Sequence, residues 1–354
     1  MSAGAAAPRP RLRVVRAGVA AADGLVLVDK PQGVTSHDVV GALRRLAATR
    51  RVGHAGTLDP MATGLLVLGV GRATRFLTYL VGADKTYEAT VRLGQETLTE
   101  DADGEVTASA GCRLQDLAAG RLEEALRSLT GEIMQVPSAV SAIRTGGVRS
   151  YARVRAGQDV ELAARPVTIY AQKLLGVPRP ALAPGGVAPP RAGCAEVVDI
   201  DLEISCSSGT YVRALARDLG RALGCGAHLT TLRRTLVGPF DCGEAVTLEG
   251  LSAQVEADAA SGDPQGLAVL PLGVAARRCL PTVGLTTSQA RALGYGQPLD
   301  AVLLDQAQVP ERPVTSKTAQ GQDVVAGLDP DGSLVALLAR RGASARPVLV
   351  LAPA

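Results

Sequence analysis

Residues 53–66 read GHAGTLDPMATGLL, in which one acidic residue, Asp59, lies among glycines and directly before Pro60. Proline disfavours helical backbone in the residue that precedes it, so Asp59 is predicted to be extended within a tight loop. The apolar run that follows, Gly64–Val70, indicates a short buried strand or the start of a buried helix. An Asp-Pro pair in a loop is most often only a turn former, so this stretch needs support from the rest of the chain.

Outside this stretch, the hydrophobic pattern alternates between strand and helix periodicity. Residues 24–46 (GLVLVDKPQGVTSHDVVGALRRL) predict a buried strand, a turn through Pro31 and Gly33, and a helix that opens near Ser36. Tyr87–Leu93 alternates as a strand does. Further predicted elements are helices over Arg121–Leu129 and Tyr211–Leu223, the second capped by Gly224, and strands over residues 160–175 and 195–206.

The length of 354 residues exceeds the roughly 100–200 residues of a typical domain, so a large domain and a smaller one are expected. Residues 1–22 read as a flexible basic tail, and residues 23–277 as the main domain. Within it, residues 176–193 are so rich in Pro, Gly and Ala that they are predicted to be a loop insertion. Residues 278–354 show short strands and turns, which favours a small β-rich domain after a mixed α/β one.

The composition is that of a soluble globular protein, with 47% hydrophobic and 20% charged residues. A net charge of +3 is too small to identify a nucleic-acid partner by itself. Arginine clusters such as Arg44-Arg45 and Arg50-Arg51 either line a phosphate track or are simply solvated faces.

The cysteine, histidine and apolar patterns narrow the class further. The six cysteines and three histidines are dispersed and lack metal-ligand spacing, so no metal site is expected. The sequence shows no secretory signal and no run of roughly 18 apolar residues. A membrane span is therefore not expected, and the cytoplasm is the expected compartment.

Several motifs occur together and in a fixed order. They are DKPQGVTSHDVV (29–40), GHAGTLDPMATGLL (53–66), GRATRF (71–76), KTYEATVRLG (85–94), GTYVRALARDLG (209–220) and AHLTTLRRTLVGPF (227–240). This set closely resembles the TruB family of bacterial tRNA pseudouridine synthases. The resemblance implies an α+β fold with a central, mainly antiparallel sheet flanked by helices, and a small C-terminal PUA-like RNA-binding domain.

The resemblance also implies a reaction and a substrate. Uridine 55 in the T arm of tRNA would be isomerised to pseudouridine, by breaking the N-glycosidic bond, rotating the flipped uracil and rejoining it through carbon. No cofactor or metal is implied, and the expected partner is the T-arm stem-loop of tRNA, bound by a monomer.

Four residues match the family's catalytic positions. Asp59 matches the nucleophile, and Arg213 matches an arginine that pairs with it and keeps it ionised. Tyr87 matches the tyrosine on which the flipped base stacks, and Tyr211 a second pocket tyrosine near enough to move a proton from carbon.

Four further residues are expected to bind the substrate. His54 matches a histidine that enters the T loop where the target base leaves, and Leu232 a leucine that closes the pocket. Lys30 and Arg72 are candidates for phosphate contacts, along with Arg44, Arg45 and Arg51. The chain departs from the family at residues 135–144 (QVPSAVSAIR), where Val140 and Arg144 replace the usual Tyr and Lys.

Three other readings remain open at this stage. Gly69–Thr74 half-resembles a G-x-G-x-x-G phosphate loop but lacks the third glycine. A non-catalytic RNA-binding or RNA-folding protein would have no need of a pocket carboxylate, which repels phosphates. A synthase with another, guide-dependent RNA target is disfavoured because the chain carries no long basic extension.

Overall fold

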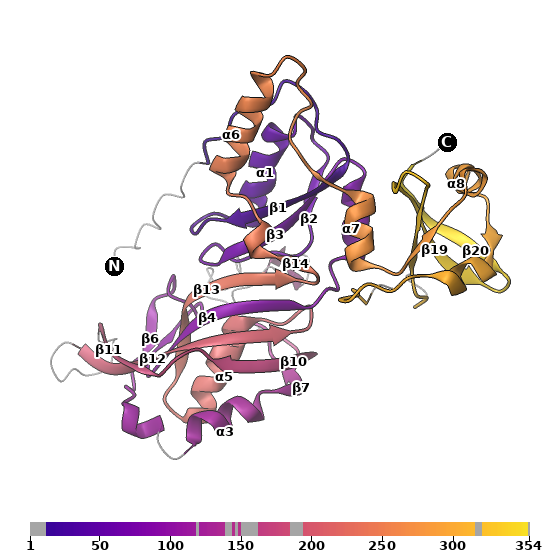
Figure 1. Ribbon diagram of the computed structural model, residues 1–354. Coiled ribbons are helices and arrows are strands. Elements are labelled where there is room, and N and C mark those ends of the chain that lie inside the picture. The colour runs from indigo at the N-terminus through magenta and orange to yellow at the C-terminus, as the bar shows by residue number, and fades with distance from the viewer. Residues whose placement is uncertain are drawn as a thin grey trace. The chain divides into compact units, whose positions relative to one another are not determined.

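The computed structural model describes residues 12–117, 120–138, 144–145, 148–149, 162–184, 194–315 and 321–352 (Figure 1). The chain divides into two compact units. The first unit combines Met1–Asp84 with Thr235–Ala354, and the second unit is Lys85–Arg234.

The first unit contains an antiparallel sheet built on the predicted strands. β1 (Gly24–Lys30) pairs along its whole length with β3 (Thr63–Val70), which settles the apolar run after Gly64 as a strand. β2 (Val52–His54) pairs with the far end of β3, and β15 (Leu270–Pro271) adds to the other edge of β1. Nearly every residue of β1 and β3 is buried, because side chains on both faces are covered.

The predicted helix near Ser36 is α1 (Ser36–Leu46). Its N-cap is Thr35, whose hydroxyl accepts from the Asp38 N–H while the Asp38 carboxylate accepts from the Thr35 N–H. This reciprocal capping box fixes where the helix starts. Before β1, Ala17 and Ala21 donate to the carbonyls of Arg45 and Ala47, so the described part of the predicted basic tail is tied to the end of α1.

The rest of the first unit closes its core. Both phenylalanines of the chain, Phe76 and Phe240, are at most 1% exposed and lie in one apolar cluster with residues of β1 and β3. The elements around them are α2 (Ala73–Phe76), η1 (Leu77–Tyr79), β14 (Phe240–Asp241), η3 (Cys242–Glu244), α6 (Leu248–Ala259) and α7 (Leu272–Cys279).

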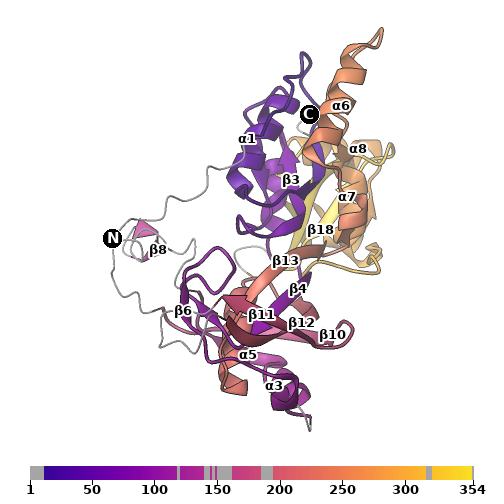
Figure 2. The ribbon, with the colours of Figure 1, turned by 90° about the vertical axis from the view of Figure 1, so that its left-hand side faces the viewer.

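The C-terminal part of the first unit is β-rich, as predicted. Its five strands follow the order β16-β18-β19-β20-β17, and α7 lies beside β18, as Figure 2 shows. The strands are β16 (Thr282–Gly284), β17 (Leu299–Asp300), β18 (Val325–Leu328), β19 (Leu334–Arg341) and β20 (Ser344–Val350), accompanied by α8 (Thr287–Gly294) and η4 (Ala301–Gln306).

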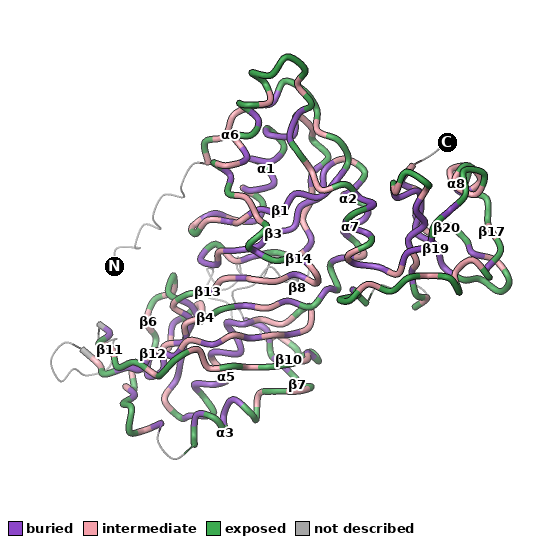
Figure 3. The backbone as a smooth tube through the Cα atoms, viewed as in Figure 1, coloured by how far each residue is buried: buried purple, intermediate pink, exposed green. Residues whose placement is uncertain are grey.

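The second unit is an antiparallel sheet with helices, so the predicted α+β class is confirmed. Its strands run in the order β13-β4-β12-β10-β7, and α3 contacts α5. In Figure 3 the strand β4 alternates between buried and less buried residues, as the period of two in its sequence predicts. The elements are β4 (Lys85–Leu93), α3 (Arg121–Ser128), β7 (Gly131–Gln135), β10 (Arg165–Leu174), β12 (Cys194–Cys206), α5 (Val212–Leu223) and β13 (Ala227–Val237), whose last three residues belong to the first unit.

One prediction for the second unit is wrong in part. Residues 176–193 were expected to form no packed element, but β11 (Arg179–Pro184) pairs with β12. Prolines are tolerated on an edge strand because the missing N–H can point away from its partner, and Pro180 and Pro184 both lie on this strand. Residues 185–193 lie outside the described part of the chain.

Short elements complete the second unit. β5 (Glu96–Thr97) and β6 (Val106–Ala108) form one two-stranded pair, and β8 (Arg144–Thr145) and β9 (Val148–Arg149) form another. A short 3-10 helix, η2 (Leu114–Leu117), precedes α3. Val140, one of the two positions that depart from the family pattern, is outside the described residues.

Candidate active site

The Asp59 loop, residues 55–62, connects β2 to β3 in the first unit. Lys30, at the end of β1, is fully buried, and its ammonium donates to the carbonyls of Pro31 at 3.0 Å, Val34 at 2.8 Å and Pro60 at 3.3 Å. An ammonium has three donors, so these three carbonyls match its whole capacity. Lys30 therefore joins the turn after β1 to the residue that follows Asp59.

A serine holds the other side of the Asp59 loop. The Ser36 hydroxyl accepts from the Leu58 N–H at 2.8 Å and donates to the Leu58 carbonyl at 3.1 Å, and Ser36 is 2% exposed. The Gly33 N–H donates to the Pro60 carbonyl at 2.8 Å. The residues on both sides of Asp59 are thus fixed by hydrogen bonds to the turn and helix that follow β1.

The structure changes the interpretation of Lys30 and shows the contacts of Arg72. A fully buried ammonium cannot reach a phosphate, so the structure makes Lys30 a support of the Asp59 loop. Arg72 donates to the Leu351 carbonyl at 2.8 Å and lies 3.4 Å from the Asp23 carboxylate, and its side chain is 47% exposed. Arg72 thus contacts the last described residues, while about half of its side chain remains accessible to a ligand.

The remaining candidates of the first unit lie near its surface or beside the loop. His54 is the last residue of β2, opposite Leu68 of β3, and is partly buried. Arg44, Arg45 and Arg51 are exposed, as a phosphate contact requires.

The second unit holds the other four predicted residues. Tyr87 lies on β4 and is 7% exposed, and Leu232 lies on β13 and is 6% exposed. Tyr211 is the N-cap residue of α5, and Arg213 is in its first turn. A turn with Gly209 in the left-handed region (φ 89°) leads from β12 into this helix, as the Gly-containing motif predicts.

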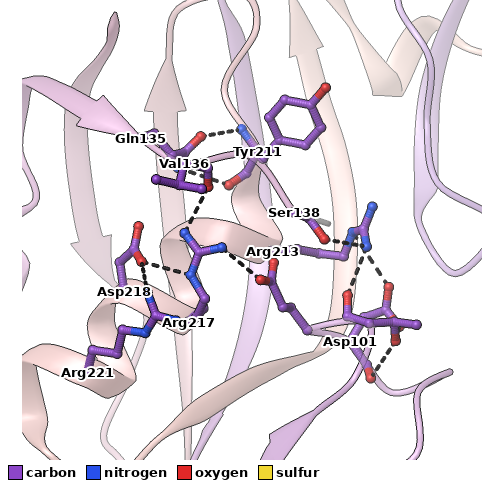
Figure 4. A network of polar contacts seen from close by, with 11 residues as sticks. Asp101, Gln135, Val136, Ser138, Tyr211, Arg213, Arg217, Asp218 and Arg221 are labelled. Atoms are coloured by element: carbon purple, nitrogen blue, oxygen red, sulfur yellow. Dashed lines mark hydrogen bonds and ion pairs between the residues drawn. The ribbon is translucent and has the colours of Figure 1, made fainter. Parts of the chain in front are cut away.

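Arg213 is buried and is held by three groups within its own unit (Figure 4). Its guanidinium donates to the Thr99 carbonyl at 2.8 Å and to the Ser138 hydroxyl at 3.1 Å, and Nε lies 3.6 Å from the Asp101 carboxylate. The side chains of Arg213 and Asp101 are only 4% and 7% exposed. A buried guanidinium needs such partners, because an uncompensated charge in a low-dielectric interior is costly.

Asp101 is the carboxylate of this group, and its environment opposes ionisation. Burial raises the pKa of Asp101 above its usual range, while the Thr99 hydroxyl, the Arg213 charge and the Asp103 N–H act in the opposite direction. The Thr99 hydroxyl donates to the Asp101 carboxylate. Asp101 therefore protonates more easily than an exposed aspartate, which bears on how Arg213 is held at low pH.

One helical turn after Arg213, Arg217 makes a second set of contacts. Its guanidinium donates to Glu100 at 2.8 Å, Asp218 at 2.9 Å and the Val136 carbonyl at 2.8 Å. Burial alone would lower the pKa of Arg217, but its hydrogen bonds to Asp218 and its attraction to Glu100 raise that pKa overall. Arg217 is therefore a charged group at any physiological pH.

Sequence reasoning missed the residues that surround Arg213 and Arg217. Asp101 and Glu100 lie in the acidic run TEDADG (99–104), and Gln135 opens the stretch QVPSAVSAIR. The carboxylates of this acidic run could balance the charge of arginines on a helix, and that was a usable signal for Asp101 and Glu100. No sequence signal marked Ser138 as a partner of Arg213.

Metal binding and membrane insertion were also considered. Among the described residues, no group of three or more His, Cys, Asp or Glu side chains could hold a metal ion. No helix in the described part of the chain is long and apolar enough to cross a membrane.

The described residues form an antiparallel α+β fold, with Asp59 in a supported loop of the first unit and the buried Arg213 at the start of a helix in the second unit. Solved structures share this fold. A Cbf5-Nop10-Gar1 complex matches at a TM-score of 0.65 with 24% identity, covering 93% of this chain and 85% of that chain. An H/ACA RNP bound to a substrate RNA matches at 0.61 with 23% identity and the same coverage.

Sequence comparisons identify the family. Residues 44–212 match the N-terminal domain of the TruB family of pseudouridylate synthases, and residues 213–278 match the C-terminal domain of tRNA pseudouridylate synthase B. The chain therefore belongs to the TruB family, and it is a pseudouridine synthase, an isomerase.

Curated relatives align over almost their whole length. The tRNA pseudouridine synthase B of Arthrobacter sp. (strain FB24) is 52% identical over 330 residues, which is 93% of this chain and 97% of that protein. Those of Streptomyces coelicolor and Thermobifida fusca are 46% and 45% identical, covering 93% and 94% of this chain and 97% and 99% of those proteins.

Proposed function

We propose that the chain converts uridine 55 in the T arm of tRNA to pseudouridine, with Asp59 as the nucleophile. The observation that carries the proposal is the intact motif around Asp59 in a chain 52% identical to a tRNA pseudouridine synthase B. The way the Asp59 loop is held supports it: Lys30 and Ser36 fix the residues on both sides of Asp59. A nucleophile held in one position loses less entropy on the way to the transition state.

The reaction needs no co-reactant, because it is an isomerisation. The bond between C1′ of the ribose and N1 of uracil breaks, the Asp59 carboxylate attacks the sugar or the base, and the detached ring turns within the pocket. A bond between C1′ and C5 then forms, the carboxylate is released, and the C5 hydrogen leaves as a proton while N1 gains one. Atoms and electrons balance within the nucleotide.

The other predicted residues take supporting roles in this proposal. Arg213 would keep the Asp59 carboxylate ionised, Tyr87 would stack on the flipped uracil, and Tyr211 would take part in moving the C5 proton. His54 would fill the place that the target base leaves in the T loop, and Leu232 would close the pocket. Arg72 would contact a backbone phosphate of the T arm.

The test follows tritium release from a T-arm stem-loop that carries tritium at C5 of its uridine. The C5 hydrogen must leave when C5 becomes the glycosidic carbon, so release reports the reaction directly. Asp59→Asn is expected to abolish release while stem-loop binding persists. The matched control is Asp263→Asn, which changes another Asp-Pro pair of the same unit at an exposed turn and is expected to leave release unchanged.

The outcomes separate the possible functions. Release from the unaltered protein that is lost in Asp59→Asn and kept in Asp263→Asn supports both the reaction and the role of the carboxylate. Full release from Asp59→Asn would exclude the Asp59 carboxylate as the nucleophile. Binding without any release by the folded protein would contradict the proposed substrate, and release from an rRNA site and not from tRNA would point to another RNA target.

A further inference from the structure

Helix α5 carries two largely buried arginines on one face, four residues apart, and only Arg213 was predicted to be a site residue. Residues four apart on a helix point the same way, so Arg213 and Arg217 share the side of α5 that is covered by the rest of the second unit. The side chains of Arg213 and Arg217 are 4% and 12% exposed. Two neighbouring buried cations can be held there only by a matching set of acceptors.

Apart from Asp218, which lies on α5 itself, those acceptors come from two segments, and each segment serves both arginines (Figure 4). From the turn 99–101, the Thr99 carbonyl and the Asp101 carboxylate contact Arg213, and the Glu100 carboxylate contacts Arg217. We name residues 99–101 and 135–138 together the α5 socket.

The second segment of the α5 socket follows the end of β7. The Ser138 hydroxyl contacts Arg213, and the Val136 carbonyl accepts from Arg217 at 2.8 Å. The two arginines thus bridge the same two segments in parallel, and a shift of one arginine displaces the acceptors of the other.

The backbone of the turn 99–101 is bent to make this possible. Glu100 has a φ of 62°, one of two positive values among the described non-glycine residues. Such a backbone is unfavourable for a residue with a side chain and persists only where surrounding contacts impose it. Here the Leu229 N–H donates to the Glu100 carbonyl at 3.1 Å, and the Glu100 side chain ends on Arg217.

Gln135 extends the α5 socket to the main chain of Tyr211. Its side-chain carbonyl accepts from the Tyr211 N–H at 2.9 Å, and its amide donates to the Tyr211 carbonyl at 3.1 Å. Gln135 is 1% exposed. This pair of bonds fixes the peptide groups on both sides of the Tyr211 ring, at the point where α5 begins.

We propose that Arg217 and Gln135 are positioning residues, which act through the α5 socket to set the side chains of Arg213 and Tyr211 for the reaction. The proposal rests on the proposed function, because it assumes that Arg213 and Tyr211 serve the isomerisation. Neither Arg217 nor Gln135 is assigned a contact with the RNA or a part in bond making. Their effect is expected in the rate constant of the chemical step.

The test is single-turnover tritium release with enzyme in excess over the T-arm stem-loop, for Arg217→Met and Gln135→Met. Both changes remove the hydrogen bonds and keep an unbranched side chain, which matches Gln in length and is shorter than Arg. Arg217→Met is expected to lower the rate constant by about 30-fold and Gln135→Met by about 10-fold, since small displacements of reacting groups are costly. The dissociation constant of the stem-loop is expected to change by less than about twofold, because neither residue is assigned an RNA contact.

The dependence of release on enzyme concentration separates positioning from simple loss of folded protein. A residue needed only for folding would lower the fraction of active enzyme, so more total enzyme would be needed for saturation while the rate constant at saturating enzyme stayed the same. A positioning residue lowers the rate constant at saturating enzyme. The matched control is Arg221→Met, which removes an arginine from the next turn of α5. The Arg221 side chain is 67% exposed and contacts Asp218 at the longer distance of 3.7 Å.

A double-variant cycle tests whether Arg217 acts through Glu100. If the pair acts together, Glu100→Gln lowers the rate constant by several-fold, and Arg217→Met/Glu100→Gln is no slower than Arg217→Met alone. Unchanged rate constants in both Arg217→Met and Gln135→Met would overturn the positioning proposal while leaving the proposed function intact. No release from the unaltered protein or from Arg221→Met would instead contradict the proposed function.

Discussion

The Asp59 loop and the α5 socket each hold a predicted catalytic side chain, but by different physical means. The Asp59 loop is held by one ammonium and one hydroxyl, whose partners are all main-chain groups within about one supersecondary unit. The α5 socket holds Arg213 and Arg217 with carboxylates as well as carbonyls, from segments that are 75 to 117 residues away in the sequence.

This difference predicts different responses to substitution. Main-chain carbonyls do not titrate, so the main-chain partners of Lys30 and Ser36 do not change their charge with pH. Carboxylates do titrate, and a buried charge left without its partner is more costly than a lost neutral hydrogen bond. The α5 socket is therefore expected to be the more fragile of the two regions.

The largest effect on tritium release is expected from Asp101→Asn. The change removes the negative charge beside the buried Arg213 guanidinium but keeps a side chain that can accept a hydrogen bond. Because burial already disfavours the charged form of Asp101, the free energy of unfolding is expected to fall by only about 1 kcal/mol. Tritium release is expected to slow by about 100-fold, because Arg213 loses one of the groups that orient it. Urea unfolding and single-turnover release measure the two effects. Asp103→Asn, an exposed neighbour in the same turn, is the control, and equal effects of the two changes would contradict the role of Asp101.

A smaller effect on release is expected from Lys30→Met, which removes the donor of the three carbonyls around the Asp59 loop. Each carbonyl loses a hydrogen bond, but the protein no longer buries a charge, so the free energy of unfolding is expected to fall by about 2 kcal/mol. Release is expected to slow by about 30-fold as Asp59 becomes less well placed. The control is Lys173→Met, which changes an exposed lysine. A lower stem-loop affinity of Lys30→Met with an unchanged rate constant would show that Lys30 contacts a phosphate.

Ser36→Ala is expected to have a milder effect on the same loop. It leaves the buried N–H and carbonyl of Leu58 without the Ser36 hydroxyl, at a cost of about 1.5 kcal/mol in the free energy of unfolding. Release is expected to slow only about threefold, since Lys30 still holds the other side of Asp59. Ser252→Ala is the control, because the Ser252 hydroxyl has no hydrogen-bond partner among the described residues. A loss in Ser36→Ala as large as in Lys30→Met would show that the two sides of the loop are not independent.

The contrast between the regions also explains what could be predicted from the sequence. The Asp59 loop could be predicted because its supports are local: the extended residue before Pro60, the turn at Gly33 and the helix start near Ser36 each have a short-range signature. The strands β1, β3, β4 and β12 followed from hydrophobic periodicity for the same reason.

The α5 socket could not be predicted, because its contacts are long-range. The sequence shows Arg213 in a helix but not that residues 99–101 and 136–138 lie against that helix. Lys30 was predicted to contact a phosphate because it lies in a matched motif, whereas its burial against three carbonyls depends on the fold and could not be read from the sequence. The strand β11 was missed because its prolines conceal an edge strand that its pairing with β12 makes possible.

A last prediction uses pH to separate the two regions. Burial raises the pKa of Asp101, and the charged groups that face it are Arg213 and Asp103. As the pH falls toward that raised pKa, Asp101 takes up a proton and becomes neutral, as asparagine is at every pH. The rate constant of the unaltered protein should therefore approach that of Asp101→Asn, so that the ratio between them, about 100 at neutral pH, narrows as the pH falls.

The ratio of the rate constant of the unaltered protein to that of Ser36→Ala is expected to stay constant, because the Ser36 hydroxyl and the Leu58 main chain do not titrate in this range. The other titratable groups are present in all three proteins, so they affect the ratios equally. The direction is fixed by the chemistry: protonation can only weaken the attraction between Asp101 and Arg213, so the Asp101→Asn ratio can narrow at low pH but not widen. A ratio that stays near 100 down to the pH at which the protein unfolds would mean that Asp101 stays ionised over this range. A ratio near 1 at every pH would mean that Thr99 and Ser138 hold Arg213 without help from the carboxylate, and that the two regions are held by the same kind of neutral bond.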